Sequence, residues 1–122
     1  MSRTIMIIDD SPSIRQVVNM ALTKAGYEVV EAEDGQDALN KLENMKVNLI
    51  ICDVNMPNMD GLTFLKTLKQ QANHKFTPVI MLTTESQQSL KMEGKMAGAK
   101  AWMVKPFKPE QMLEAISKLI LP

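Results

Sequence analysis

A chain of 122 residues predicts one domain with one hydrophobic core. Its 14 acidic residues balance its 14 basic ones and no lysine or arginine run occurs, which argues against nucleic-acid binding. Because Cys52 is the single cysteine, no internal disulfide can form and a reducing compartment is favoured. The sequence shows no signal peptide and no apolar run long enough to span a membrane, so we expect a cytoplasmic protein.

The first predicted elements are a strand, a helix and a second strand. Residues 5–8 form a short apolar run that predicts a strand. Apolar residues then recur every three or four positions, as on one face of a helix. Ser11 is a suitable N-cap, Pro12 a suitable first helical residue and Gly26 a suitable end. A weaker apolar run follows at 27–31.

The middle of the chain continues this alternation. A helical pattern at 38–45 precedes an apolar run at 48–52, which ends at Asp53. A third helical pattern, at 62–68, follows Asp60 and Gly61. We therefore expect a helix, a buried strand and another helix in this order.

The last third of the chain contains the weakest helical pattern. An apolar run at 78–82 predicts a fourth strand. The helical pattern that follows, at 86–99, is weak because its apolar residues are scattered and Gly94 interrupts it. A glycine inside a helix is about 1 kcal/mol less favourable than an alanine. A strand at 101–104 and a helix at 113–120 complete the chain.

Five strand–helix pairs predict an α/β fold with an open, doubly wound parallel sheet. The apolar runs are continuous, which is typical of strands buried on both faces. In such a sheet, ligands bind along the edge formed by the carboxyl ends of the strands. Five polar residues stand at these ends and should converge: Asp9, Asp10, Asp53, Thr83 and Lys105.

This set of side chains favours magnesium and phosphoryl chemistry. Three crowded carboxylates repel one another unless a cation neutralises them, and Mg²⁺ accepts few oxygen ligands from protein and shares phosphate oxygens. Lys105 adds a positive charge and Thr83 a hydrogen-bond donor. Carboxylates also act as phosphoryl-accepting nucleophiles. Each signal has an ordinary interpretation by itself, as a helix cap or a loop residue, but their coincidence predicts a site.

Four stretches match a known family in order and spacing: residues 8–11, 53–61, 83–85 and 104–107. The chain resembles the receiver domains of bacterial two-component response regulators, and within them the CheY-like chemotaxis branch. The resemblance covers nearly the whole chain. It implies one receiver domain over 1–122 without an output domain, and a flavodoxin-like sheet in the order 2-1-3-4-5 with five helices.

The resemblance also implies roles for the acidic residues. Asp53 would be the phosphoacceptor. Asp10 and Asp53 would bind Mg²⁺ directly, together with the backbone carbonyl of Asn55. Asp9 would act through a metal-bound water.

Other roles concern the phosphoryl group and the switch. By the same resemblance, Lys105 would contact the phosphoryl oxygens and precede a cis bond to Pro106. Thr83 would move toward the phosphoryl group, and Trp102 would be the switch aromatic, bulkier than the usual tyrosine.

Three residues would tune the lifetime of the phosphoryl group. Asn55 and Glu85 match the CheY-like pair beside the active site and imply a short lifetime. Thr84 replaces the usual smaller alanine, which narrows the path of water and opposes that effect.

The implied function is a phosphorylation-controlled binding module, not an enzyme with an outside substrate. The phosphoryl donor would be a histidine kinase, CheA-like if the chemotaxis likeness holds. The protein itself would be a monomer. It would pass the signal to a partner through the helix from Ser86, the strand at Trp102 and the final helix. The flagellar motor switch is one candidate partner, although Ser86, Gln88 and Lys91 depart from the motor-binding pattern. Service as a phosphate sink is the alternative within the family.

A different class remains open: a Mg²⁺-dependent phosphohydrolase with an aspartyl-phosphate intermediate. Such enzymes usually carry a second aspartate two residues after the nucleophile, where this chain has Asn55, a poor proton donor. Two further expectations lie outside the motif. His74 should be a solvated loop residue, and Met20 should fill the core with Met81 and Met112.

Overall fold

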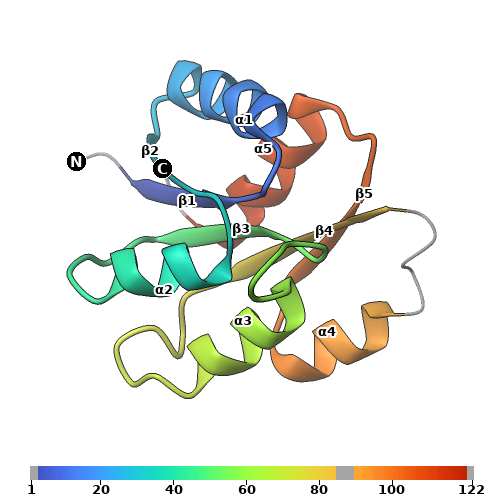
Figure 1. The fold of residues 1–122 in the computed structure, drawn as a ribbon. Coiled ribbons are helices and arrows are strands. Elements are labelled where there is room, and N and C mark those ends of the chain that lie inside the picture. Colours follow the sequence, from blue (N-terminus) through green and yellow to red (C-terminus); the bar gives the residue numbers. More distant parts are fainter. Residues whose placement is uncertain (1–2, 85–89, 121–122) are drawn as a thin grey trace.

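The computed structural model describes residues 3–84 and 90–120 and contains one parallel sheet in the order β2-β1-β3-β4-β5 (Figure 1). This order and the alternation of strands and helices confirm the predicted fold. The strands are β1 (Thr4–Ile8), β2 (Glu28–Ala32), β3 (Leu49–Asp53), β4 (Val79–Thr84) and β5 (Ala101–Lys105). The helices are α1 (Pro12–Lys24), α2 (Gly35–Leu42), α3 (Gly61–Lys69), α4 (Lys91–Ala97) and α5 (Pro109–Leu119).

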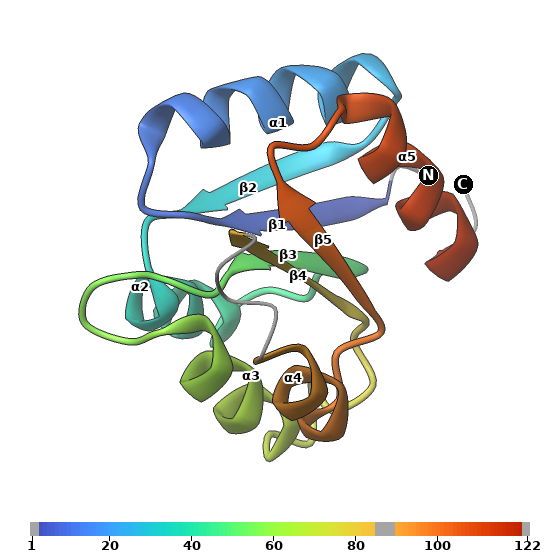
Figure 2. The same cartoon turned by 90° about the vertical axis from the view of Figure 1, so that its right-hand side faces the viewer.

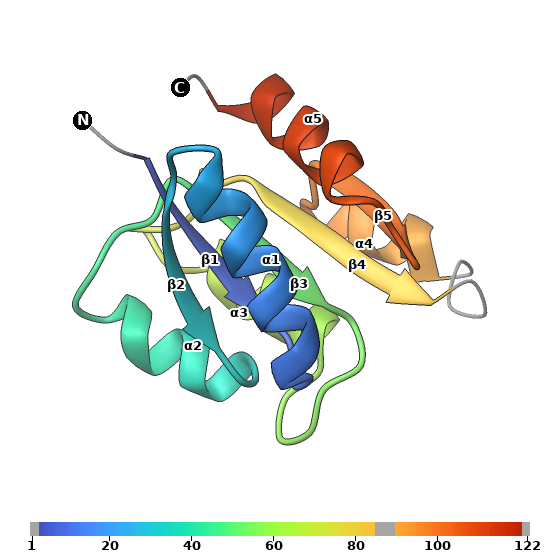
Figure 3. The ribbon, with the colours of Figure 1, turned by 90° about the horizontal axis from the view of Figure 1, so that it is seen from above.

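Helices cover both faces of the sheet because successive side chains of each strand point to opposite sides. In β1, Ile5 and Ile7 pack in the core beneath α1 and α5, whereas Met6 and Ile8 pack in the core beside α2 and α3. Figure 2 shows α1 and α5 on one side of the sheet and α2, α3 and α4 on the other. Seen from above, α1 and α5 are the near layer (Figure 3). The two cores explain why the strands read as continuous apolar runs.

Local signals fix the beginning and end of α1. The Ser11 hydroxyl accepts from the Ile14 N–H, and Pro12 is the first helical residue. Gly26, with φ of 99°, follows the helix end, and this left-handed conformation suits glycine. These caps confirm the predicted bounds. In the described part of the chain, no helix combines the length and apolar character that a membrane span needs.

The structure corrects three expectations. Helix α2 ends at Leu42, so Met45 lies in the following loop instead of in the helix. Met20 is 66% exposed on α1, although Met81 and Met112 are buried as predicted. His74 is buried rather than solvated.

The burial of His74 has a local cause. Its Nε2 lies 2.9 Å from the carbonyl oxygen of Leu42 at the end of α2. A helix end leaves carbonyl groups without partners inside the helix, and the imidazole satisfies one of them. The histidine therefore ties the α3–β4 connection to α2. Of the weak helix predicted at 86–99, residues 91–97 form α4, while 86–89 lie outside the described residues.

Candidate functional site

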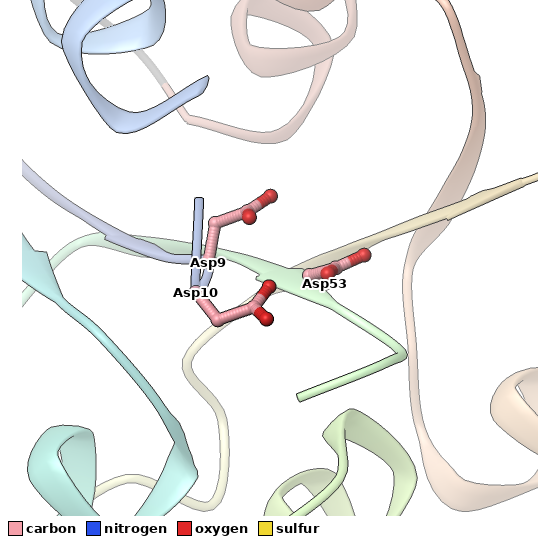
Figure 4. Close-up of side chains that lie close together, drawn as sticks. All are labelled: Asp9, Asp10 and Asp53. Carbon is pink, nitrogen blue, oxygen red and sulfur yellow. The ribbon is translucent and has the colours of Figure 1, made fainter. Parts of the chain in front are cut away.

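Three carboxylates meet at the carboxyl edge of the sheet. Asp9 and Asp10 follow β1, and Asp53 is the last residue of β3, the neighbouring strand. One oxygen from each lies within 4.8 Å of the others, and Figure 4 shows the side chains side by side. Asp9 and Asp53 are buried, whereas Asp10 is exposed at the mouth of the cluster. The predicted convergence of these residues is therefore correct.

Lys105 closes the cluster from the end of β5. Its Nζ lies 3.0 Å from Oδ2 of Asp9 and 3.1 Å from Oδ1 of Asp53. Burial works against its charge, but the hydrogen bond to Asp9 and the charges of Asp53 and Asp9 outweigh burial and raise the pKa of Lys105. The amine therefore stays protonated. The bond from Lys105 to Pro106 is cis, as the resemblance implied.

Asp53 is the carboxylate most disturbed by this setting. Burial and the nearby charge of Asp9 raise its pKa from 3.8 to about 6, although Lys105 opposes the shift. A raised pKa means that burial disfavours the ionised form of this carboxylate, and a nearby cation stabilises that form. Together with exposed Asp10, this oxygen-only donor set fits a hard divalent ion such as Mg²⁺.

Asp9 is held by the chain around it. Its Oδ1 accepts from the backbone N–H of Ser11 at 2.9 Å, and its carbonyl oxygen accepts from Arg15 at 2.6 Å. With Oδ2 on Lys105, both carboxylate oxygens have partners. Asp9 is therefore a fixed charge at the back of the cluster, while Asp10 faces solvent.

Thr83 and Thr84 end the strand between Asp53 and Lys105. Thr83 is fully buried, and its hydroxyl donates to the Thr84 carbonyl at 3.1 Å. The register pairs Thr84 with Lys105. Asn55 is exposed in the loop two residues after Asp53. Glu85, predicted to tune the site, lies outside the described residues.

Trp102 lies in β5 against a glycine of α4. A Cβ built on Gly94 would come within 2.2 Å of Cζ3 of the indole, so the ring occupies the space that a side chain would need. The ring is only partly exposed, and its Nε1 is buried with no hydrogen-bond partner among the described residues. A buried N–H group without a partner costs about 1–3 kcal/mol.

Residues that shape the loop after β3 were not predicted from the sequence. A Cβ on Gly61 would lie 2.1 Å from the Asp53 carbonyl oxygen, so only glycine lets α3 begin against this backbone. Asn58 donates to Asp34 across the loop at 2.8 Å. The helix signal at Asp34, an N-cap type before an apolar pattern, was visible in the sequence, but its distant partner was not.

Comparison with known proteins agrees with this geometry. Residues 5–117 match the response regulator receiver domain family, and the chain belongs to that family. The chemotaxis protein CheY of Bacillus subtilis is 40% identical over 124 residues, covering 98% of this chain and 99% of that protein.

Solved structures are similar over the same length. Chemotaxis protein CheY4 of Vibrio cholerae has a TM-score of 0.93 at 46% identity, covering 98% of this chain and 100% of that one. The receiver domain of a sensor histidine kinase from Pseudomonas aeruginosa has a TM-score of 0.89 at 25% identity, with 98% of both chains covered. That structure holds a magnesium ion coordinated in its active-site cleft.

Proposed function

We propose that this protein is a chemotaxis-type response regulator that accepts a phosphoryl group from a histidine kinase onto Asp53. The observation that carries the proposal is the position of Asp53: buried at the end of β3, beside two further aspartates and 3.1 Å from the Lys105 ammonium. The kinase would be CheA-like, in keeping with the likeness to chemotaxis proteins.

The acidic cluster would hold Mg²⁺. Asp10 and Asp53 would be direct ligands with the Asn55 carbonyl, and Asp9, whose oxygens are already engaged, would act through water. When bound, the ion would neutralise the carboxylates and the charge that develops on the transferred phosphoryl group.

Transfer itself needs Asp53 as an ionised nucleophile. One of its carboxylate oxygens attacks phosphorus while the bond from phosphorus to the donor's imidazole nitrogen breaks, and that nitrogen keeps the electron pair. The product is an acyl phosphate on Asp53. Lys105, already within hydrogen-bond distance of Asp53, pairs with the phosphoryl oxygens without a large movement.

The same site would end the signal. A water molecule attacks phosphorus, the bond to the Asp53 oxygen breaks and inorganic phosphate leaves. Asn55 and Glu85 would favour a short lifetime, and Thr84, exposed at the end of β4, would restrict water. The protein would thus catalyse only its own phosphorylation and dephosphorylation, not the turnover of an outside substrate.

The signal would leave through the α4–β5–α5 side of the molecule. Met92 and Met96 of α4 are 65% and 83% exposed and lie one helical turn apart. Lys91 and Lys95 line a neighbouring cavity of about 240 Å³ that Trp102 also borders. Flexible methionines beside basic residues suit an output protein with an acidic, apolar binding segment, of which the flagellar motor switch is one candidate.

The proposed partners also suggest a compartment. A histidine kinase takes its phosphoryl group from ATP, and Cys52 is a free thiol in the core. We therefore place the protein in the cytoplasm. We also propose that it acts as a monomer.

The decisive test is labelling of the Asp53→Asn variant with acetyl phosphate and Mg²⁺, followed by intact-mass spectrometry. Wild type should gain one phosphoryl group, and Asp53→Asn none. Asp37→Asn, which removes an equal charge from the surface of α2, should be labelled like wild type. Undiminished labelling of Asp53→Asn would sink the assignment, and steady turnover of a phosphomonoester would favour a phosphohydrolase.

Hydrogen exchange tests the output side. Exchange measured with and without beryllofluoride should change most in α4, β5 and α5, because these elements lie next to Thr83 and Lys105. A change confined to α1 and α2 would contradict the proposed output surface. An unchanged pattern together with normal phosphorylation would favour a phosphate sink.

A further inference from the structure

The loop after β3 contains a strained turn centred on Asn58. The Met59 N–H donates to the Pro57 carbonyl at 2.7 Å, and φ of Asn58 is 68°. A three-residue turn with a positive φ at its centre is rare and strained. Among the residues that the structure describes, Asn58 is the only non-glycine residue with positive φ. Such a conformation persists only where its surroundings hold it.

Asp34 of the neighbouring helix holds this turn. Asn58 Nδ2 donates to Oδ2 of Asp34 at 2.8 Å, and Asp34 is only 6% exposed. The other oxygen, Oδ1, accepts from the Asp37 N–H at 2.8 Å and caps α2. Hydrogen bonds from the Asp37 backbone and from Asn58 lower the pKa of Asp34, so the acceptor is charged at neutral pH. The two oxygens therefore have separate tasks.

Packing supports the same contact between the loop and α2. A Cβ on Gly35 would lie 3.0 Å from Cγ and Sδ of Met59, so the loop rests directly on the first turn of the helix. At its base the loop is closed by the Gly61 N–H, which donates to the Val54 carbonyl at 2.8 Å. The base and the Asn58 turn together fix the path of the residues between them.

We propose that Asp34 and Asn58 are positioning residues for the metal site, because their hydrogen bond fixes the turn and thereby the direction of the Asn55 carbonyl. The inference rests on the proposed function, in which that carbonyl is a Mg²⁺ ligand. Neither side chain touches the ion or the phosphoryl group. Removing an outer partner of a metal site costs about 10–100-fold in affinity, and we expect about tenfold because Asp10 and Asp53 remain.

Three variants separate this role from ordinary stability. Asn58→Gly removes the hydrogen bond but tolerates the positive φ. Asp34→Ser keeps an oxygen for the α2 cap but is too short to reach the amide of Asn58. The double variant Asp34→Asn/Asn58→Asp restores a donor–acceptor pair in reverse, with the net charge of wild type. Asp37→Asn is the charge control, because the Asp37 carboxylate accepts from the Glu33 N–H and from Lys41, both outside the loop.

The measurements are Mg²⁺ affinity by calorimetry and melting temperature in the presence of a chelator. Asn58→Gly and Asp34→Ser should each raise the Mg²⁺ dissociation constant about tenfold, and the double variant should recover most of the loss. Weaker Mg²⁺ binding in single variants that keep the melting temperature of wild type is the outcome that a stability defect alone does not predict. Wild-type affinity in both single variants, or equal weakening in the double variant, would overturn the inference.

The proposed function fails in a different way. If wild type itself bound no Mg²⁺ and took no phosphoryl group from acetyl phosphate, the metal site would be absent and not misaligned. A wild type that binds Mg²⁺, with single variants that bind it equally well, leaves the proposed function intact and rejects only the role of Asp34 and Asn58.

Discussion

The two halves of the sheet's carboxyl edge are built differently. In the β1–β3 half, every residue of β3 is buried, and α3 is capped by Asp60, whose Oδ1 accepts from the Thr63 N–H at 2.8 Å. In the β4–β5 half, every residue of β5 is only partly buried, and α4 is short and has no side-chain cap within the described part of the chain. The buried Nε1 of Trp102 lies in this second half.

The difference separates two tasks. Under the proposed function, phosphoryl transfer depends on fixed positions, and the proposed nucleophile Asp53 and its neighbour Asp9 belong to the tightly packed half. Switching needs a segment with two arrangements of similar free energy, and few buried contacts lower the cost of leaving one of them. The arrangement of β5 and α4 meets that condition. Four predictions test this contrast, from the largest expected effect to the smallest.

Gly61→Ala should give the largest loss of stability. The new Cβ would lie 2.1 Å from the Asp53 carbonyl oxygen and 2.9 Å from Cα of Val54, which are backbone atoms that cannot swing away. We expect a loss of about 3 kcal/mol or more in the free energy of unfolding, at the upper end of overpacking effects. Urea denaturation measures it. A change in the free energy of unfolding close to zero would show that the backbone of the β1–β3 half shifts more readily than its packing indicates.

Asp53→Asn should remove a pH-dependent penalty in the absence of divalent cations. The folded-state pKa of Asp53 is raised from 3.8 to about 6, so the folded protein holds this proton more tightly than the unfolded chain does. Stability should therefore fall as pH rises from about 4 to about 6. At pH 7 the asparagine variant should be more stable by about 2–3 kcal/mol, and this figure already includes the opposing effect of Lys105 on the pKa of Asp53.

Melting temperatures measured across pH 4–7.5 with a chelator check this sign. Added Mg²⁺ should reverse the order of the two proteins, since only wild type keeps the full set of carboxylates. Parallel curves for wild type and Asp53→Asn over that pH range would mean that Asp53 is not destabilised by its surroundings.

The sequence predicts the fold and the centre of the site because both depend on local signals. Apolar runs, helical spacing and caps define the elements, and the parallel order of strands brings Asp9, Asp10 and Asp53 to one edge. The same strand order places Lys105 at this edge, whereas the cis bond at Pro106 follows from the family resemblance, and the structure confirms both.

What the sequence does not show depends on contacts between distant segments. His74 looks like a polar loop residue because its partner, the Leu42 carbonyl, lies 32 positions away. Met20 follows the apolar spacing of α1 yet stands at the exposed edge of that pattern. Gly94 appears as a defect in a helix, whereas in the fold it makes room for the indole of Trp102. Helical spacing shows on which face of a helix a residue lies, but it does not show which residues of other elements pack against that face.

Gly94→Ala should cost less than Gly61→Ala, although the new Cβ would approach its nearest neighbour about equally closely in both, at 2.2 Å and 2.1 Å. At Gly94 the atoms met belong to the indole of Trp102, a side chain that can rotate outward. Better helix propensity offsets about 1 kcal/mol, so we expect a loss of about 1–2 kcal/mol in the free energy of unfolding. Trp102 emission should shift toward that of a solvated indole.

The double variant Gly94→Ala/Trp102→Leu is the control for this clash. Because leucine leaves room for the new methyl group, the alanine should cost less beside leucine than beside tryptophan. Additive costs would show that the new methyl group does not meet the indole, and that contact with Trp102 does not set the cost of alanine at position 94.

The smallest effect is spectral and concerns the link between the two halves. Thr83 is buried at the end of β4, between the aspartate cluster and β5, and Trp102 is the single tryptophan. If a phosphoryl group draws the Thr83 hydroxyl toward Asp53, the space beside Trp102 changes and the indole moves. Emission should then change on adding beryllofluoride with Mg²⁺, beyond the change with Mg²⁺ alone.

Thr83→Ala should suppress that additional change, and Thr83→Ser, which keeps the hydroxyl, should retain most of it. The comparison isolates the hydroxyl because both variants remove the same methyl group. An indole that merely senses charge near Asp53 would respond alike in wild type and in both variants. An indole that moves with Thr83 leaves a site where its Nε1 is buried without a partner among the described residues, so the outward arrangement recovers a hydrogen bond to water. The unmet N–H donor destabilises the inward arrangement of the indole. A small displacement of Thr83 is then enough to change the population of that arrangement.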